Sequence, residues 1–150
     1  MRVVVDANVC VSAVLSAKGN PARILDHALG GVLGGGPRDF ELCAPSQLFS
    51  KLQEVLARPK IAGRLEWSSE EIATYARRLR LAVEEVPLED DARIPQYTSD
   101  PEDDPYAHAA VLARAAYLVS GDEDILGMKD PPVSPVTPAQ FVKLWDSNLL

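Results

Sequence analysis

Short apolar runs rich in β-branched residues alternate along the chain with longer stretches in which apolar residues recur at helical spacing. The runs at 2–5, 40–44 and 117–120, with shorter ones at Val86 and Val136, are typical of buried parallel strands. The helical stretches, counted with their caps, are 8–15, 21–29, 46–59, 68–83, 104–115 and 137–145. Strands that alternate with helices predict an α/β fold with a mostly parallel sheet, in which the first run is the central strand.

Helix starts are marked by capping residues and by Pro in the first turn. Ser46 and Asp104 are predicted N-caps, and Asp104 is followed directly by Pro. The Gly-rich segment 30–37 and the polar, acidic segment 87–103 are predicted to be loops. Two capping boxes, in which a hydroxyl and a side chain three residues later bind each other's backbone N–H groups, are Ser68 with Glu71 and Thr137 with Gln140.

Acidic side chains follow two of the predicted strands and open one helix. Asp6 comes directly after the first strand, and Asp122 and Asp124 come just after the strand that ends at Ser120. Asp104 opens the helix that leads into that second strand. Because ligands of open α/β sheets bind beyond the carboxyl ends of the strands, we expect these carboxylates to converge on one edge of the sheet. Clustered carboxylates need a counter-charge, and oxygen ligands favour Mg²⁺ or Mn²⁺, which can activate water for attack on a phosphodiester.

Each of these residues also has a purely structural interpretation. Asp104 before Pro could be only a helix cap, and Asp122 after Gly could be only part of a turn. Asp6 is harder to explain in this way, since an ionised side chain at the end of an apolar strand is costly when it is buried without a partner. Asn8 could cap the following helix or hold a metal-bound water, and His108 is expected to pack or pair locally.

The charge balance excludes a protein that binds nucleic acid through phosphate contacts alone. Fifteen Lys and Arg residues against 22 Asp and Glu residues give a formal net charge of −7, whereas a phosphate-binding surface should be basic. A nucleic acid would therefore need a cation to approach the acidic side chains. No basic stripe or aromatic stacking motif stands out that would identify an RNA target.

The length and composition are typical of one globular domain. The chain has 150 residues, of which 47% are hydrophobic and 25% charged, and we expect a single domain over 1–150. No apolar run is long enough for a membrane span, and the first residues do not form a secretory signal. Cys10 and Cys43 lie in apolar surroundings, which favours buried thiols in a reducing cytoplasm. With two histidines and no Cys-x-x-Cys pair, a common zinc site is excluded.

Several short motifs occur in order over nearly the whole chain. They are Val3–Val9 with Ser12-Ala13, Glu54–Lys60, Asp100–Tyr106, Leu118–Leu126 and Val136–Pro138. As an ordered set, these motifs resemble those of PIN-domain proteins, in the group of VapC-like toxin ribonucleases. The resemblance implies a three-layer, Rossmann-like α/β domain and an Mg²⁺- or Mn²⁺-dependent endoribonuclease that hydrolyses single-stranded RNA. It also implies a homodimer and, often, a partner antitoxin protein.

The resemblance assigns the family's site to particular residues of this chain. Asp6 matches the first acidic position, Asp104 the acid that opens the later helix, and Asp122 the acid after the small-residue turn. Asp124 matches an auxiliary acid, and Ser120 matches the Ser or Thr that supports the site. The predicted catalytic residues are Asp6, Asp104 and Asp122; these three and Asp124 are the predicted metal ligands, and the predicted supporting residues are Asn8, Lys51, Ser120 and Asp124.

One position departs from the family pattern. The family usually has a Glu on the helix ahead of the Glu-Val-Leu-x-Arg-Pro-Lys stretch, and this chain has Lys51 there. At about 100° per residue, Lys51 lies on the border of the buried arc, and Glu54 lies about 60° further round, nearly opposite the core. Lys51 could be a surface lysine whose stem covers apolar surface. Alternatively, its ammonium occupies the place of a cation, pairs with Asp6 or Asp104, and weakens metal binding.

Three functions remain open at this point. The first is a metal-dependent PIN ribonuclease whose activity is reduced by Lys51. The second is a catalytically degenerate PIN domain that acts as a binding or regulatory module, and Lys51 is the feature that discriminates between the two. The third is a phosphatase of the haloacid-dehalogenase type, which also begins at a strand-end Asp but needs a second Asp where this chain has Asn8.

Overall fold

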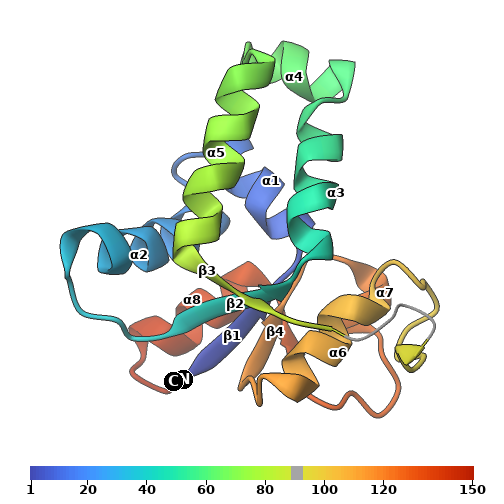
Figure 1. The fold of residues 1–150 in the computed structure, drawn as a ribbon. Coiled ribbons are helices and arrows are strands. Elements are labelled where there is room, and N and C mark those ends of the chain that lie inside the picture. The colour runs from blue at the N-terminus through green and yellow to red at the C-terminus, as the bar shows by residue number, and fades with distance from the viewer. Residues whose placement is uncertain (89–92) are drawn as a thin grey trace.

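The computed structural model describes residues 1–88 and 93–150, which form a parallel sheet with helices on both faces (Figure 1). The strands are β1 (Arg2–Val5), β2 (Glu41–Pro45), β3 (Val83–Val86), β4 (Tyr117–Val119) and β5 (Ser134–Val136). The helices are α1 (Ala7–Leu15), α2 (Asn20–Gly34), α3 (Gln47–Leu56), α4 (Pro59–Leu65), α5 (Ser69–Ala82), α6 (Asp104–Leu112), α7 (Glu123–Leu126) and α8 (Pro138–Asp146). The strand order is β3-β2-β1-β4-β5 and each pair is parallel, which confirms the predicted α/β fold with β1 at its centre.

The sheet lies between two helical layers. Val3, Val4 and Val5 of β1 are fully buried, because a central parallel strand is covered on both faces. Helix α6 packs on β1, β2 and β4, and α8 lies behind the sheet in Figure 1. Helices α1, α2, α3 and α5 contact one another, and α3 and α5 rise side by side from the sheet to α4. This arrangement confirms the predicted three-layer architecture.

The Gly-rich segment 30–37, predicted as a loop, is partly helical. Helix α2 continues through Gly34 and ends at Gly35, whose φ of 63° lies in the left-handed region that glycine adopts without strain. Gly31 is buried where the chain turns back, and a Cβ there would lie 2.9 Å from Cγ of Arg38. Glycine therefore permits close packing at this helix end instead of interrupting the helix. Even with the extension, no helix in the described part of the chain is long and apolar enough to cross a membrane.

Two short helices are absent from the sequence prediction. The sequence predicts that Pro59 ends a helix, and α3 does end before it, at Leu56. Pro59 then takes the first position of α4, where its missing N–H removes no hydrogen bond. Helix α7 has only 4 residues, which is too short to produce a periodic pattern.

The boundaries of two predicted helices differ from those observed. The N-cap position of α6 is held by Asp103, not by Asp104, because Pro105 takes the second helical position instead of the first. The same helix ends at Leu112, earlier than predicted. Val83 belongs to β3 and not to the helix before it. The α6 boundary matters for function, because it decides which of two adjacent aspartates faces the sheet edge.

The predicted caps are only partly confirmed. Both capping boxes form, at the starts of α5 and α8. Ser46 holds the N-cap position of α3 but makes no capping hydrogen bond, since its hydroxyl donates to Oε1 of Gln47 at 3.3 Å.

Candidate functional site

Asp6 and Ser120 join the carboxyl ends of the two neighbouring strands β1 and β4. Asp6 is the N-cap of α1, and its Oδ1 accepts a hydrogen bond from the backbone N–H of Val9 at 2.9 Å. Its Oδ2 accepts a hydrogen bond from the Ser120 hydroxyl. Asp6 is 3% exposed and Ser120 is fully buried. The first predicted acid is therefore a buried carboxylate held in place from both sides at the edge of the sheet.

The buried position of Asp6 changes its acidity. The pKa of Asp6 is raised from 3.8 to about 6, mainly by burial; the negative charge of Asp122 also raises it, and the hydrogen bonds from Ser120 and Val9 partly offset the rise. Desolvation penalises the ionised form of a carboxyl group, so the site favours any partner that brings positive charge. A carboxylate with this property is a candidate for function as well as for structure.

Asp122 and Asp124 lie at the start of α7, just beyond the end of β4. Oγ of Ser120 accepts a hydrogen bond from the backbone N–H of Asp122 at 2.9 Å. Oδ1 of Asp122 accepts from the backbone N–H of Asp124 at 2.8 Å, so Asp122 is the N-cap of α7. Oδ1 of Asp124 accepts from the Ser99 hydroxyl at 2.9 Å, which ties α7 to the loop before α6. One serine thus positions both the first acid and the segment that holds the later two.

Asp103 also faces this group, although the sequence analysis did not select it. It occupies the N-cap position of α6 without capping the helix, and its Oδ2 is buried with no hydrogen-bond partner. Burial, together with repulsion from Asp122, Asp100, Asp6 and Asp124, raises the pKa of Asp103 to about 7. One ligand oxygen each of Asp100, Asp103 and Asp124 lies within 4.8 Å of the others. Asp103 is therefore the buried centre of the acidic cluster.

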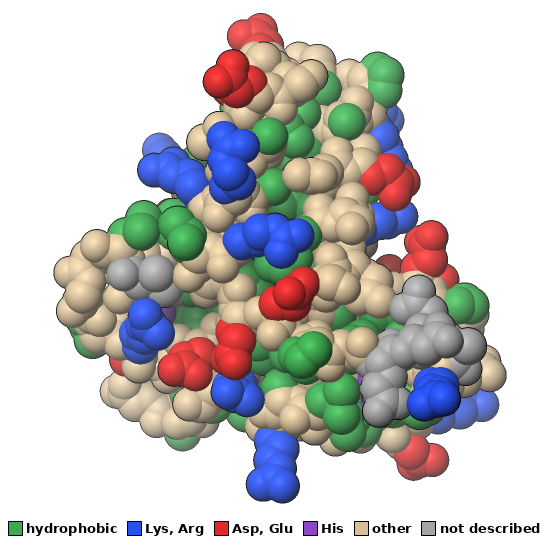
Figure 2. Space-filling view, in the orientation of Figure 1, with side chains coloured by type: hydrophobic (Ala, Val, Ile, Leu, Met, Phe, Trp, Pro, Cys, Tyr) green, Lys and Arg blue, Asp and Glu red, His purple; other side chains and the backbone are tan. Residues whose placement is uncertain are grey.

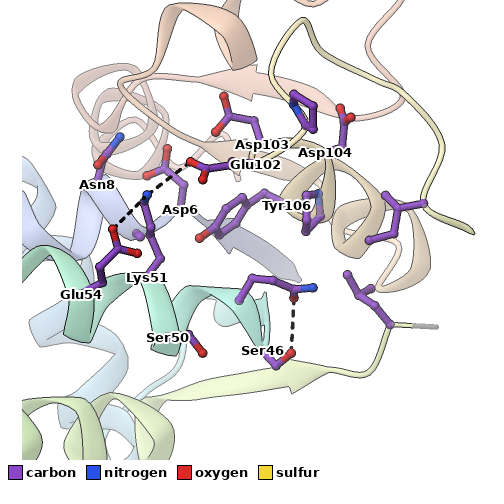
Figure 3. A pocket seen from close by; sticks show the side chains of 16 residues that line it. Asp6, Asn8, Ser46, Ser50, Lys51, Glu54, Glu102, Asp103, Asp104 and Tyr106 are labelled. Atoms are coloured by element: carbon purple, nitrogen blue, oxygen red, sulfur yellow. Dashed lines mark hydrogen bonds and ion pairs between the residues drawn. The ribbon is translucent and has the colours of Figure 1, made fainter. Parts of the chain in front are cut away.

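Asp104, the predicted third ligand, holds a loop instead. Its Oδ1 accepts hydrogen bonds from the backbone N–H groups of Tyr97 and Thr98 at 2.9 and 2.8 Å. In Figure 3 its side chain stands apart from Asp6. Adjacent residues on a helix point about 100° apart, so only one of Asp103 and Asp104 can face the sheet edge. The sequence marks an acidic residue at the start of this helix by the pair Asp103-Asp104. The observed start of α6 turns Asp103, not Asp104, toward the cluster.

Lys51 on α3 reaches the site but pairs with neither Asp6 nor Asp104, so this part of the prediction was wrong. Its Nζ lies 3.3 Å from Oε2 of Glu102 and 3.8 Å from Oε1 of Glu54 (Figure 3). Its side chain is 32% exposed, which agrees with the predicted position at the border of the buried face. The glutamate that accepts its charge lies in the loop before α6, which the sequence could not place opposite α3.

A cleft of about 930 Å³ lies beside the carboxylates, between α1, α3 and the loop before α6. Its walls include Asp6, Lys51 and Glu54 (Figure 3). Glu54 is exposed, as predicted, but it also lines the cleft, where it pairs with Lys51. Asn8 lines the cleft too. Because Asp6 is the cap of α1, the interpretation of Asn8 as the cap is wrong, and its contact with a metal-bound water stays a prediction.

The chemistry of the acidic cluster fits a hard divalent cation. Its donor atoms are carboxylate oxygens, the ligands that suit Mg²⁺ and Mn²⁺. The cluster contains no nitrogen or sulfur ligand among the described residues. Nδ1 of His108 lies 2.9 Å from the Tyr97 hydroxyl, and Cys10 and Cys43 are buried free thiols outside the cluster. A buried acceptor without a donor, such as Oδ2 of Asp103, is costly and needs an explanation. A cation at this position would remove that cost.

The acidic excess is both spread over the surface and gathered at the site. On the face shown in Figure 2, basic and acidic side chains are interspersed and form no continuous patch of either sign. At the sheet edge, Asp103 is surrounded by the negative charges of Asp6, Asp100, Asp122 and Asp124. Negative charge is therefore concentrated at the sheet edge around Asp103, whereas charges of both signs alternate on the face shown in Figure 2.

Comparisons with known proteins place this chain in a family. The chain matches the PIN domain family over residues 2–124, which is most of its length. Its fold resembles a chain in the crystal structure of VapBC2 from Rickettsia felis bound to a DNA fragment from their promoter, with a TM-score of 0.60 and 12% sequence identity. That alignment covers 91% of this chain and 98% of the other. No curated protein matches at a significant level. As its ordered motifs predict, the chain belongs to the PIN domain family.

Proposed function

We propose that the protein is a metal-dependent endoribonuclease of the VapC-like toxin type, which hydrolyses phosphodiester bonds in single-stranded RNA. The observation that supports this most directly is the meeting of Asp6 and Asp103, which are 3% and 9% exposed, with Asp122 and Asp124 where β1 and β4 end. Buried carboxylates with raised pKa values are unfavourable for stability and are concentrated at functional sites. Membership of the PIN domain family supports a nuclease over the phosphatase considered from the sequence.

We assign a bound Mg²⁺ or Mn²⁺ ion to Asp6, Asp103, Asp122 and Asp124. Such an ion polarises a phosphoryl oxygen and offsets the charge of the RNA backbone against that of the carboxylates. The protein's own contribution is to fix the ligands: the Ser120 hydroxyl orients Asp6, and the Ser99 hydroxyl orients Asp124. Partners of this kind, outside the ligand set, keep the carboxylates in position before a substrate arrives.

The cleft beside the carboxylates gives room for unpaired nucleotides. Its volume of about 930 Å³ is comparable with that of a binding site for a small organic molecule. Ser46, Ser50 and Asn8 line it and offer hydrogen-bonding groups to bases or sugars. Single strands expose base edges that a duplex hides, which supports single-stranded RNA as the substrate. With a net charge of −7, the protein should bind RNA weakly when no divalent cation is present.

We propose that Lys51 reduces the activity of this site. An ammonium in place of a carboxylate changes the formal charge at position 51 from −1 to +1. The ion pair with Glu102, the residue directly before Asp103, holds this positive charge beside the acidic cluster. Even when paired, an ammonium so close to the cluster weakens its attraction for a divalent cation, so cleavage should need a high metal concentration.

The same contact favours a second candidate function, a catalytically degenerate PIN domain that acts as a binding or regulatory module. Lys51 lines the cleft together with Asp6 and Asp103, and its positive charge can replace part of the charge of a cation. In that case RNA would enter the cleft and remain intact.

Two partners follow from the VapC-like assignment. We propose a homodimer and a cognate antitoxin protein, by analogy with the VapBC2 structure that the fold resembles. We place the activity in the cytoplasm, because Cys10 and Cys43 are free thiols, which a reducing compartment preserves.

Cleavage of an end-labelled single-stranded RNA tests the proposal. Wild type should cleave the RNA with Mn²⁺ and leave it intact with a chelator, and Asp6→Asn should leave it intact in both. Asp130→Asn is a matched control, since Asp130 is exposed and its positive φ of 48° suits Asn. The same RNA annealed to its complement should resist. Equal cleavage by wild type and Asp6→Asn would contradict the assignment of this site, and binding without cleavage would favour the degenerate module.

A further inference from the structure

Asp100 lies in the loop before α6, and one of its carboxylate oxygens lies within 4.8 Å of oxygens of Asp103 and Asp124. The hydroxyl of Thr98 donates to the carbonyl oxygen of Asp100 at 2.7 Å and accepts from its backbone N–H at 3.0 Å. The backbone N–H of Asp103 donates to the same carbonyl oxygen at 3.0 Å. Thr98 is itself buried, at 6% exposure. These bonds fix the turn that presents Asp100 to the cluster.

We infer that Asp100, Asp103 and Asp124 form a divalent-cation site in which Asp100 replaces the carboxylate that this chain lacks at position 51. This inference rests on the proposed metal dependence and adds a ligand from the loop. The three residues each offer one oxygen, and these atoms lie within 4.8 Å of one another. Two oxygens on opposite sides of an Mg²⁺ ion are about 4.2 Å apart at a bond length of about 2.1 Å. Oxygens of adjacent ligands are about 3.0 Å apart around the same ion, so side-chain rotations that shift the oxygens by about an ångström would bring all three onto one cation.

An acidic cluster alone would not identify a cation site, and Asp103 supplies the second observation. Its Oδ2 is buried and lacks any hydrogen-bond partner in the part of the chain that the structure describes. An ionised carboxylate can only accept, so the missing partner must be a donor or a cation. The cluster around it offers further acceptors and no donor side chain that meets this oxygen. A cation is the partner that satisfies all three carboxylates together.

The ion pair of Lys51 is compatible with this site. Its Nζ pairs with Glu102 and Glu54, and among the described residues it forms no ion pair with Asp100, Asp103 or Asp124. Glu102 also donates its backbone N–H to Oδ1 of Asp100 at 3.0 Å. Glu102 thus takes up the charge of Lys51 and leaves the neighbouring carboxylates available. Asp100, in the loop before α6, thus supplies the negative charge that α3 lacks because position 51 is a lysine.

Titration of the full chain with Mn²⁺ alone, followed by calorimetry, tests the inference without an activity measurement. Asp100→Asn is the informative variant, because Asn keeps an Oδ1 acceptor for the N–H of Glu102 and so preserves the turn. We expect the dissociation constant for Mn²⁺ to rise about tenfold or more. Glu123→Gln is the matched control, since it removes one negative charge between Asp122 and Asp124 from an exposed side chain outside the group. It should change the dissociation constant by less than about threefold, an effect of exposed charge that salt screens.

The outcomes separate this inference from the proposed function. If Asp100→Asn binds Mn²⁺ like Glu123→Gln while Asp6→Asn loses binding, the metal dependence stands and the role of Asp100 is refuted. If wild type binds no Mn²⁺, both fail. Circular dichroism and metal-free melting of Asp100→Asn and Glu123→Gln should match those of the wild type. If Asp100→Asn fails this check, Asp100→Ser takes its place, because a Ser hydroxyl can also accept from the N–H of Glu102; unchanged Mn²⁺ affinity in that variant would refute the role of Asp100.

A double-mutant cycle tests the idea of replacement itself. In the Lys51→Glu background a carboxylate returns to α3, so Asp100→Asn should raise the Mn²⁺ dissociation constant by much less than in the wild-type background. The same rise in both backgrounds would mean that Asp100 does not substitute for position 51.

Discussion

The ammonium of Lys51 on α3 pairs with the carboxylate of Glu102, 3.3 Å away in the loop before α6. The lysine occupies a position at which PIN-domain proteins usually have a glutamate, and it lines the same cleft as Asp6 and Asp103. Its charge is balanced by a neighbour of the acidic cluster and not by the cluster itself. The remaining carboxylates therefore keep their capacity to bind a cation, and the strength of that binding is the property that Lys51 should modify.

Lys51→Glu should tighten metal binding and raise RNA cleavage. The change removes an ammonium that repels the cation and adds a carboxylate beside the site. Calorimetry with Mn²⁺ and the initial rate of cleavage measure the two effects, and Lys18→Glu, at an exposed position, controls for the change in net charge. Glu54→Gln should do little, because Lys51 keeps its shorter contact with Glu102. Unchanged affinity and unchanged rate in Lys51→Glu would make Lys51 a bystander.

Mn²⁺ should raise the melting temperature of the wild type by binding only the folded state. Asp6→Ala and Asp122→Ala should each abolish this rise, because both carboxylates are assigned as ligands. Differential scanning calorimetry with and without Mn²⁺ measures it, with Asp130→Asn as a control from an exposed turn whose positive φ suits Asn. A rise that persists in both variants would show that the cation binds elsewhere.

Without metal, the protein should lose stability as the pH rises from about 4 to about 7. The pKa values of Asp6 and Asp103 in the folded state are raised from 3.8 to about 6 and about 7. Between these limits the folded state binds more protons than the unfolded state, so the free energy of unfolding falls with rising pH. For Asp6, a difference of about two pKa units corresponds to roughly 3 kcal/mol.

Denaturant unfolding in the presence of a chelator, at several pH values, measures this dependence. Asp6→Asn should show a shallower decline than wild type, since it removes one of the two titrating groups, and Asp130→Asn should follow the wild type. If the wild type and Asp6→Asn decline in parallel, Asp6 is ionised in the folded state at all these pH values.

Asp104→Ala should destabilise the fold by about 1–3 kcal/mol, because it leaves the N–H groups of Tyr97 and Thr98 without their acceptor. Asp104→Asn keeps an oxygen acceptor and should retain most of the stability and the Mn²⁺ affinity. Urea unfolding and Mn²⁺ titration measure the two properties. A large loss of Mn²⁺ affinity in a stable Asp104→Asn variant would return Asp104 to the ligand set in place of Asp103.

The fold was predictable because its signals are local. The β-branched run of β1, the two capping boxes and the alternation of strands and helices all reflect preferences that act over a few residues. The sequence signals failed where a local rule met a longer-range contact. Gly31 is helical and Arg38 packs closely against it, and Pro59 opens one helix instead of only ending another.

The site was predictable only in part, because its details depend on which way neighbouring side chains point. The positions of Asp6 and Asp122 follow from the topology of the sheet, since both residues come just after a strand. The choice between Asp103 and Asp104 depends on a single residue at the start of α6, which sequence patterns do not determine. The partner of Lys51 lies in a loop 51 positions away, and no local pattern connects the two.

The dependence of RNA cleavage on Mn²⁺ concentration tests the central claim most directly. Rates on one single-stranded RNA should be compared for wild type, Lys51→Glu and Asp122→Asn, from a chelator up to saturating Mn²⁺. We predict no cleavage in the chelator, a saturable rise with Mn²⁺ for wild type, half-saturation at lower Mn²⁺ for Lys51→Glu, and no cleavage by Asp122→Asn. Cleavage that is independent of metal, or no cleavage by wild type and Lys51→Glu when calorimetry shows Mn²⁺ bound, would contradict a metal-dependent ribonuclease at this site.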